Sequence, residues 1–217
     1  LAMPLTDEHT LALRLLGLPI VSIGASIDGA PSVGIDDTAV ARAAVDHLLN
    51  LGHRQIGLVS GQADDERFSF QTSTLHRQDY AEALHDAGVA AEAGWVAAGP
   101  HGIDGGRAAM VELLARPELP TAVLAEYDEL AIGAIDGIRR AGLRVPEDVA
   151  VIGIDDHEMS AVMGLTTMAQ DISAQGHLAA GMVLQLLGIE GGTPPSEAVL
   201  TKVRLVLRGS TAPPRSA

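Results

Sequence analysis

Short apolar runs alternate with longer amphipathic stretches along most of this chain. Strands are predicted at residues 20–24, 55–61, 95–98, 121–125, 149–154 and, with a more alternating pattern, 199–207. Helices are predicted at residues 38–51, 77–87, 105–116, 128–141 and 174–187. Strands that alternate with helices across short connections are typical of a parallel sheet. Strands that are apolar on both faces are expected where helices cover both faces. The pattern therefore predicts an α/β fold.

The composition supports a large core built almost entirely from aliphatic residues. Hydrophobic residues make up 47% of the 217 residues, whereas aromatic residues make up 2%. No apolar stretch reaches the roughly 18 residues that span a bilayer, and residues 1–10 lack the pattern of a signal peptide. The absence of cysteine excludes a disulfide framework and a thiolate metal site, and is compatible with the cytoplasm.

The chain is strongly acidic, with 14 Lys and Arg residues against 28 Asp and Glu residues and a net charge of −14. Such a surface repels the phosphate backbone, so this segment alone is not expected to bind nucleic acid. The loop at residues 62–75 is long and polar and holds both phenylalanines, which predicts a mobile segment that packs against something. The tail at residues 211–217 is expected to be disordered.

Carboxylates follow two of the apolar segments. Asp155 and Asp156 stand at the end of the strand predicted at residues 149–154, and Asp36 follows a short apolar "VGI". In parallel α/β sheets, ligands bind outside the carboxyl ends of the strands. One carboxylate at such a position could cap the next helix, whereas two raise the possibility of a ligand.

The sequence contains none of the motifs tested for catalysis or for metal binding. There is no "GxxxxGK" phosphate loop, no "GxGxxG" that opens a helix and no "HExxH". A loose nucleophile elbow at residues 24–28 fails because Asp28 stands where glycine is required. Three consecutive residues such as Asp155, Asp156 and His157 rarely converge on one ion. The sequence therefore predicts no enzyme, no cofactor and no metal site.

Four further segments of the chain form a recognisable set. They are "TAVARAAVDHLLNLGHRQIGLVSG" at residues 38–61, "PTAVLAEYDELAIGAIDGIRRAGLRVPEDVAVIGIDD" at 120–156, "LTTMAQD" at 165–171 and "VRLVLRGST" at 203–211. These segments resemble transcription factors of the lactose-repressor/galactose-repressor (LacI/GalR) family. They occur in the family's order and extend over nearly the whole chain, so the match is highly specific.

This resemblance implies a periplasmic-binding-protein-like fold of type I, with two lobes that each hold a parallel sheet flanked by helices. The expected N-terminal lobe is residues 1–61 plus 171–196, and the expected C-terminal lobe is 62–170 plus 197–212, followed by a tail at 213–217. The N-terminal lobe is expected to be incomplete, because "LAMPL" at the start resembles a middle strand. The family's helix-turn-helix domain is also absent from these residues.

The same resemblance suggests which residues line the cleft between the lobes. In relatives the residue matching Asp155 accepts hydrogen bonds from ligand hydroxyls, which suits an acceptor-only carboxylate, whereas Asp156 would cap the following segment. The family's pocket arginine stands four residues before an aromatic; here that aromatic is Tyr80, and the arginine position is held by His76, with Arg77 beside it. The candidate ligand-binding residues are Asp155, Tyr127, His76, Arg77, His101, Asp36 and Asp171.

The resemblance implies the effector-sensing and dimerisation domain of a bacterial, cytoplasmic transcriptional regulator. Its expected partners are a sugar-like effector, a second copy of the chain, and operator DNA through a separate N-terminal domain only. The apolar helix at 128–141 suggests a dimer contact at Leu130, Ile132 and Ile135; the alternative is a helix packed wholly on its own lobe. A transporter's sugar-binding protein, which has the same fold, and an enzyme remain alternative functions.

Overall fold

The computed structural model describes residues 6–24, 27–62, 72–90, 95–193 and 198–215. They divide into two compact units. The first unit contains residues 6–36 and 170–203, and the second contains residues 37–62, 72–169 and 204–215, within the described ranges. The "LAMPL" segment and most of the loop at 62–75 lie outside the described residues, while the last part of that loop is the start of a helix.

The described strands of the second unit form a six-stranded sheet, in the order β4-β3-β5-β6-β7-β9. The strands are β3 (Ile56–Gly61), β4 (Val96–Gly99), β5 (Ala122–Ala125), β6 (Ala150–Asp155), β7 (Thr166–Ala169) and β9 (Arg204–Val206). Neighbouring strands are parallel except for β7 and β9. The helices are α2 (Asp37–Asn50), α3 (Thr72–Asp86), α4 (Ile103–Leu114), α5 (Asp128–Arg140) and α6 (Glu158–Met163). This arrangement confirms the predicted α/β fold with parallel sheets.

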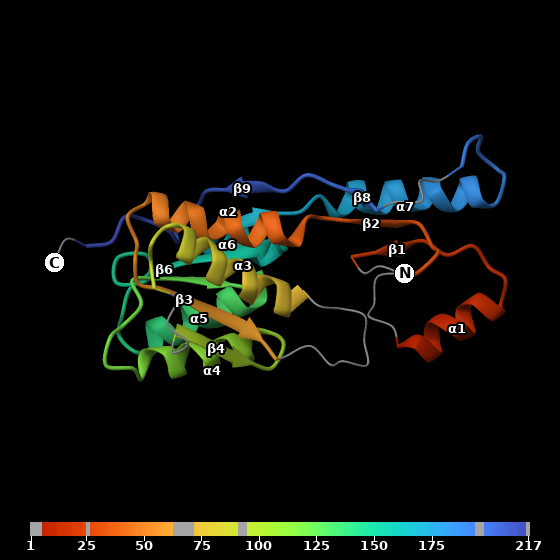
Figure 1. Cartoon of the computed structure of the whole chain (residues 1–217). Coiled ribbons are helices and arrows are strands. Elements are labelled where there is room, and N and C mark those ends of the chain that lie inside the picture. Colours follow the sequence, from red (N-terminus) through yellow and green to blue (C-terminus); the bar gives the residue numbers. More distant parts are fainter. Residues whose placement is uncertain (1–5, 25–26, 63–71, 91–94, 194–197, 216–217) are drawn as a thin grey trace. The chain divides into compact units, whose positions relative to one another are not determined.

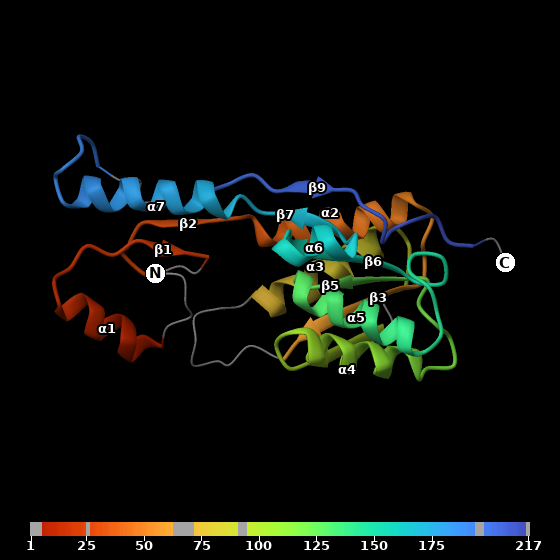
Figure 2. The same ribbon diagram turned by 180° about the vertical axis from the view of Figure 1, so that it is seen from behind.

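The path of the chain through this sheet reverses once, beside β3. From β3 the chain crosses through α3 to β4 on one side, and from β4 it returns through α4 to β5 on the other side. Because parallel crossovers are right-handed, this reversal puts α4 and α5 on the opposite face from α3. Figures 1 and 2 show α4 beside α5 on one face and α2 beside α3 on the other. The carboxyl ends of β3 and β5 are therefore a topological switch point.

Glycines bring the backbones of α4 and α5 into contact. A Cβ atom at Gly133 would lie 2.0 Å from the carbonyl oxygen of Ile103, and one at Gly106 would lie 2.1 Å from that of Leu130. Both distances are far below van der Waals contact, so only glycine fits at these positions. The aliphatic core of the second unit packs around this helix pair, as predicted from the composition.

The first unit has a three-stranded parallel sheet in its described residues, in the order β1-β2-β8. Its elements are α1 (Asp7–Leu15), β1 (Ser22–Ile23), β2 (Ser32–Gly34), α7 (Ile172–Leu186) and β8 (Val199–Leu200). Ala179 and Met182 of α7 pack on Val33 of β2 and on Val21, which precedes β1, with Val199 partly buried against them. The strand predicted at 199–207 is thus two strands, because the chain passes from β8 in one unit to β9 in the other.

The structure differs from two expectations based on the sequence. Strand β3, expected in the N-terminal lobe, hydrogen-bonds to both β4 and β5 and lies inside the larger sheet, so the unit boundary falls at Asp36–Asp37. The tail is also ordered as far as residue 215. His53 Nε2 lies 2.8 Å from the carbonyl oxygen of Ala212, and Arg215 Nη1 lies 2.8 Å from Asp148 Oδ1. These contacts hold the tail against the second unit.

Candidate functional site

A buried carboxylate, Glu126, lies at the switch point of the second unit. It follows β5 directly and is only 3% exposed. Its oxygens accept hydrogen bonds from Ser60 Oγ at 2.6 Å, from the Gly61 backbone N–H at 2.8 Å and from Ser73 Oγ at 2.8 Å. A carboxylate is buried at low cost only when donors of this kind satisfy it. Glu126 therefore ties the end of β3 and the first turn of α3 to the end of β5.

Arg77 reaches the same point from α3. Its Nε donates to Ser60 Oγ and its Nη2 donates to the Gly61 carbonyl oxygen, each at 2.8 Å. Nε also lies 3.8 Å from Glu126 Oε1, so the two charges form an ion pair. About a third of the arginine side chain is exposed, at 32%, and its Nη1 has no hydrogen bond within the described residues. Arg77 therefore brings a partly exposed guanidinium to the carboxyl edge of the sheet.

His76 faces a different neighbour, although it is adjacent to Arg77 in sequence. Its side chain is 2% exposed, and its Nε2 lies 3.7 Å from Asp37 Oδ1 at the start of α2. Neither ring nitrogen has a hydrogen-bond partner in the part of the chain that the structure describes. Consecutive residues on a helix point about 100° apart, which separates the surroundings of the two side chains. Of this pair, Arg77 makes the contacts with the ends of the sheet strands.

His101 and Tyr127 form a second pair at this edge. His101 follows β4 and is exposed, and Tyr127 stands immediately before α5 and is partly buried. His101 Nδ1 lies 2.7 Å from the Tyr127 hydroxyl, and the two rings stack with centroids 5.7 Å apart. Burial is the largest cause that raises the pKa of Tyr127 to about 12. At neutral pH the Tyr127 phenol is therefore protonated and can act as a hydrogen-bonding group.

Asp155 ends β6 in a backbone conformation that L-amino acids rarely adopt. Its φ angle is 114°, and that of Asp156 is 61°. Positive φ angles at two consecutive non-glycine residues are strained and persist only where surrounding contacts hold them. Asp156 receives a hydrogen bond from Arg208 Nη2 at 2.7 Å, while Arg208 Nη1 donates to the Leu165 carbonyl oxygen. The contacts of Asp156 hold the strained pair, and the carboxylate of Asp155 is half-buried at the edge.

The segment after Asp155 is anchored by Asp128 and not by a cap from Asp156. Asp128 is 1% exposed and accepts hydrogen bonds from the His157 N–H, Ser160 Oγ and Thr167 Oγ1. Burial is the main reason that its pKa is raised above the ordinary value. The cap of α6 is His157, whose side chain accepts from the Met159 N–H. The expectation that Asp156 caps the following segment is therefore wrong.

Asp36 and Asp171 belong to the first unit. Asp171 is exposed and caps α7, because its Oδ1 accepts a hydrogen bond from the Ala174 N–H at 2.8 Å. Asp36 is also exposed and follows β2. Of the residues predicted to bind ligand, Arg77, His101, Tyr127 and Asp155 all lie at the carboxyl edge of the six-stranded sheet.

Sequence reasoning missed Glu126. In "LAEYDELA" it looks like an ordinary polar residue at the end of a strand, because its three donors come from residues 60–73. The only signal was a charged residue at the carboxyl end of an apolar run, which is the feature that singled out Asp155.

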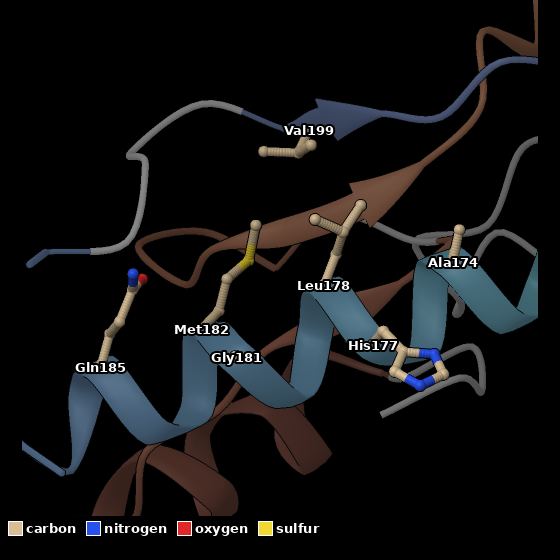
Figure 3. Close-up of a pocket in the computed structure, with 7 residues that line it drawn as sticks. All are labelled: Ala174, His177, Leu178, Gly181, Met182, Gln185 and Val199. Atoms are coloured by element: carbon tan, nitrogen blue, oxygen red, sulfur yellow. The ribbon is translucent and has the colours of Figure 1, made fainter. Parts of the chain in front are cut away.

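A cavity of about 570 Å³ lies along α7 in the first unit. Figure 3 shows Leu178 and Met182 on the side of the helix that faces Val199, with His177 and Gln185 at other points of the lining. Ala174 and Gly181 complete the lining. Specific pockets for polar ligands need several convergent hydrogen-bonding groups. This cavity is largely aliphatic and contains none of the predicted ligand-binding residues.

The apolar side chains of α5 are buried in the core of the second unit. Leu130 and Ile135 are 0% exposed, and Ile132 is 7% exposed. All three belong to the core cluster around α4 and α5. Leu130 and Ile135 therefore have no surface left for a partner subunit, and their expected place in a dimer interface is wrong.

The described residues contain no group of three or more His, Asp or Glu side chains that could hold a metal ion. Within the same ranges, no helix is long and apolar enough to cross a membrane.

The fold and the site match one class of protein. A family model described as a periplasmic binding protein-like domain matches residues 45–211. The crystal structure of a LacI family transcriptional regulator from Mycobacterium smegmatis is 34% identical with a TM-score of 0.78, and the match covers 94% of this chain and 74% of that one. The chain therefore belongs to the LacI family and is a periplasmic-binding-protein-like effector-binding domain.

Other similar proteins are also transcriptional regulators. The repressor CytR of Escherichia coli is 34% identical over 183 residues, which are 83% of this chain and 52% of the repressor. The structure of the regulator CelR in complex with cellobiose is 30% identical with a TM-score of 0.80, over 95% of this chain and 63% of that one. The chain spans about half the length of the curated relatives it matches first. These similar proteins are regulators and not enzymes.

Proposed function

We propose that the chain senses a small polar effector, a sugar or a related metabolite, in the cleft between its two lobes. The observation that carries this proposal is the group of polar side chains at the topological switch point of the second unit. Arg77 offers a donor there, and the stacked pair of His101 and Tyr127 offers a ring and polar edges. Ligands of open parallel sheets bind at such a point. Asp155, held in a strained conformation at the same edge, supplies a carboxylate acceptor.

Hydroxyl groups are the ligand chemistry that these residues suit best. An ionised carboxylate accepts only, a guanidinium donates only, and a sugar hydroxyl can partner either. An aromatic ring can stack on the apolar face of a sugar. The regulator CelR was solved with cellobiose, which supports a sugar-like ligand for this chain. Asp36, Asp171 and His76 remain candidates for the rest of the wall.

We further propose that this sensing controls DNA binding by a separate helix-turn-helix domain of a cytoplasmic regulator that acts as a homodimer. The similar protein CytR is named as a helix-turn-helix-type repressor. The net charge of −14 on the present residues makes them unsuited to binding DNA themselves. Of the three residues first considered for the dimer, only Ile132 retains exposed surface, so other residues must supply most of any interface.

The proposal is tested by thermal-shift screening of the whole protein against sugars, nucleosides and polyols. A ligand that binds only the folded state raises the melting temperature by mass action. The hit should then change the affinity of the whole protein for its operator, while the present residues alone should not shift DNA at physiological salt. Sequence-selective binding of DNA by these residues alone would contradict the proposal.

A further inference from the structure

At the carboxyl edge of the second unit, carboxylates balance the positive charges of the arginines. This balance bears on the charge that a ligand can carry. Among the described residues, Arg77 reaches the switch point through hydrogen bonds to Ser60 and Gly61, and its partner Glu126 is buried. Arg208 is paired with Asp156 in the same manner. Each of these arginines can still donate hydrogen bonds, but its positive charge is already compensated by a carboxylate. Asp155 is a further carboxylate at this edge.

The helices that begin at this edge do not leave a positive end for an anion. A helix N-terminus attracts anions unless acidic residues already complement its dipole. The first turn of α4 carries Asp104, that of α5 carries Asp128 and Glu129, and that of α6 carries Glu158. These acids complement the N-terminal dipoles of their own helices. The first turn of α3 carries no acid of its own. A buried carboxylate from another element complements it, because Glu126 Oε2 accepts a hydrogen bond from Ser73 Oγ in that turn.

Among the described residues of the second unit, one further cation, Arg204, lies along this edge of the sheet. Arg204 stands opposite Ala169 on β9, and Ala169 stands opposite Asp155 on β6. At about 4.8 Å between neighbouring strands, Arg204 is roughly 10 Å from Asp155 and farther from the switch point. It is also exposed, where water and salt weaken its field. Arg204 therefore does not reverse the sign of the charge at the switch point.

We propose that the effector carries no phosphate or other anionic group, so the site selects neutral, hydroxyl-rich molecules and rejects their phosphorylated forms. This inference rests on the proposed function and narrows the ligand class of that site. Phosphate recognition relies on uncompensated arginine or lysine, or on free helix N-termini. Arg77 and Arg208 have carboxylate partners, and acids stand in the first turns of α4, α5 and α6. An incoming phosphate would also face the carboxylate of Asp155.

The first experiment compares matched ligands on the whole protein by calorimetric titration. Ribose and glucose are each paired with the ester that carries a terminal phosphate, and inorganic phosphate alone is the third probe. We expect the neutral member of any pair that binds to bind at least about tenfold more tightly, and inorganic phosphate not to bind. Phosphate binding, or a phosphorylated sugar that binds as tightly as its neutral form, would overturn the inference.

A second experiment creates the missing positive charge. Glu126→Gln removes the carboxylate that compensates Arg77 and should give the protein measurable affinity for inorganic phosphate. Because Glu126 is buried, His101→Arg is the companion variant: it adds a cation at an exposed position on the same edge. The matched control is His85→Arg, which adds the same charge at an 89% exposed position near the far end of α3.

The outcomes separate this inference from the proposed function. Gain of phosphate binding by His101→Arg but not by His85→Arg supports the inference even when no sugar binds. No gain by a folded His101→Arg variant overturns it, since charge would then not decide what binds at this edge. If phosphorylated sugars bind better than neutral ones, the inference fails while the proposed sensing function stands. If the effector screen finds no ligand, the proposed function fails independently of the phosphate result.

Discussion

Replacing Asp128 by alanine removes the anchor of the segment that follows Asp155. The carboxylate of Asp128 accepts hydrogen bonds at 2.9 Å from the His157 N–H, at 2.5 Å from Ser160 Oγ and at 2.7 Å from Thr167 Oγ1. Ser160 and Thr167 are 0% exposed, so water cannot replace the lost acceptor for either hydroxyl. Each buried group left without a partner costs about 1–3 kcal/mol. The variant should therefore lose roughly 3–5 kcal/mol of folding free energy, the range expected when a buried charged network is broken.

Urea denaturation followed by circular dichroism measures this loss as a lower midpoint at an unchanged slope. Asp128→Asn keeps the shape and one acceptor oxygen, so it should lose only about 1–2 kcal/mol. Asp104→Ala, the same substitution at a 91% exposed position, should leave the midpoint essentially unchanged. If Asp128→Ala denatures at the same urea concentration as the Asp104 variant, the anchoring role assigned to Asp128 is refuted.

The difference in stability between the parent protein and the Asp128→Asn variant should depend on pH. The pKa of Asp128 is raised in the folded protein, mainly by burial. A raised carboxyl pKa means that the folded state binds the proton more tightly than the unfolded state does. The stabilisation that comes from protonating Asp128 is fully present below the unfolded pKa of about 3.9. It is lost as pH rises through the raised folded pKa. The stability of the parent relative to Asp128→Asn should thus fall as pH rises over this window, and a rise would contradict the assigned direction.

Three further substitutions test the helix packing and the ligand edge. Gly133→Ala should cost about 3 kcal/mol in urea denaturation, because its Cβ would lie 2.0 Å from a backbone oxygen, whereas Gly181→Ala, which meets nothing within 4 Å, should be neutral or slightly stabilising. Asp155→Asn should lower the affinity for an identified effector by about ten- to 150-fold in calorimetry, which corresponds to the loss of one charge-assisted hydrogen bond. An affinity within twofold of the parent would show that the pocket lies elsewhere. Arg208→Met removes the ion-pair partner of Asp156 and should lower the affinity for the same effector about tenfold. If Arg208 acts by positioning Asp155, the substitution should have little further effect on affinity in the Asp155→Asn variant.

The sequence by itself determined the layered architecture. Apolar runs at 55–61, 121–125 and 149–154 are strands because residues buried on both faces of a parallel sheet must be apolar throughout. The same local logic placed Asp155 at a carboxyl end, where such sheets bind ligands. These features depend only on neighbours in the chain, so a linear pattern contains them.

Only the tertiary structure decided which strand joins which sheet and which side chains meet. Nothing local distinguishes a strand of one lobe from a strand of the other. Only its pairing with β4 and β5 places β3 in the second unit and not, as the sequence predicted, in the N-terminal lobe. Periodicity marks α5 as apolar, but it cannot reveal that both the sheet and α4 use that surface. Glu126 gains its role from donors on two other elements, and Arg77 differs from His76 because a helix turns each residue toward a different neighbour. These outcomes depend on contacts between residues far apart in the chain, which no local pattern specifies.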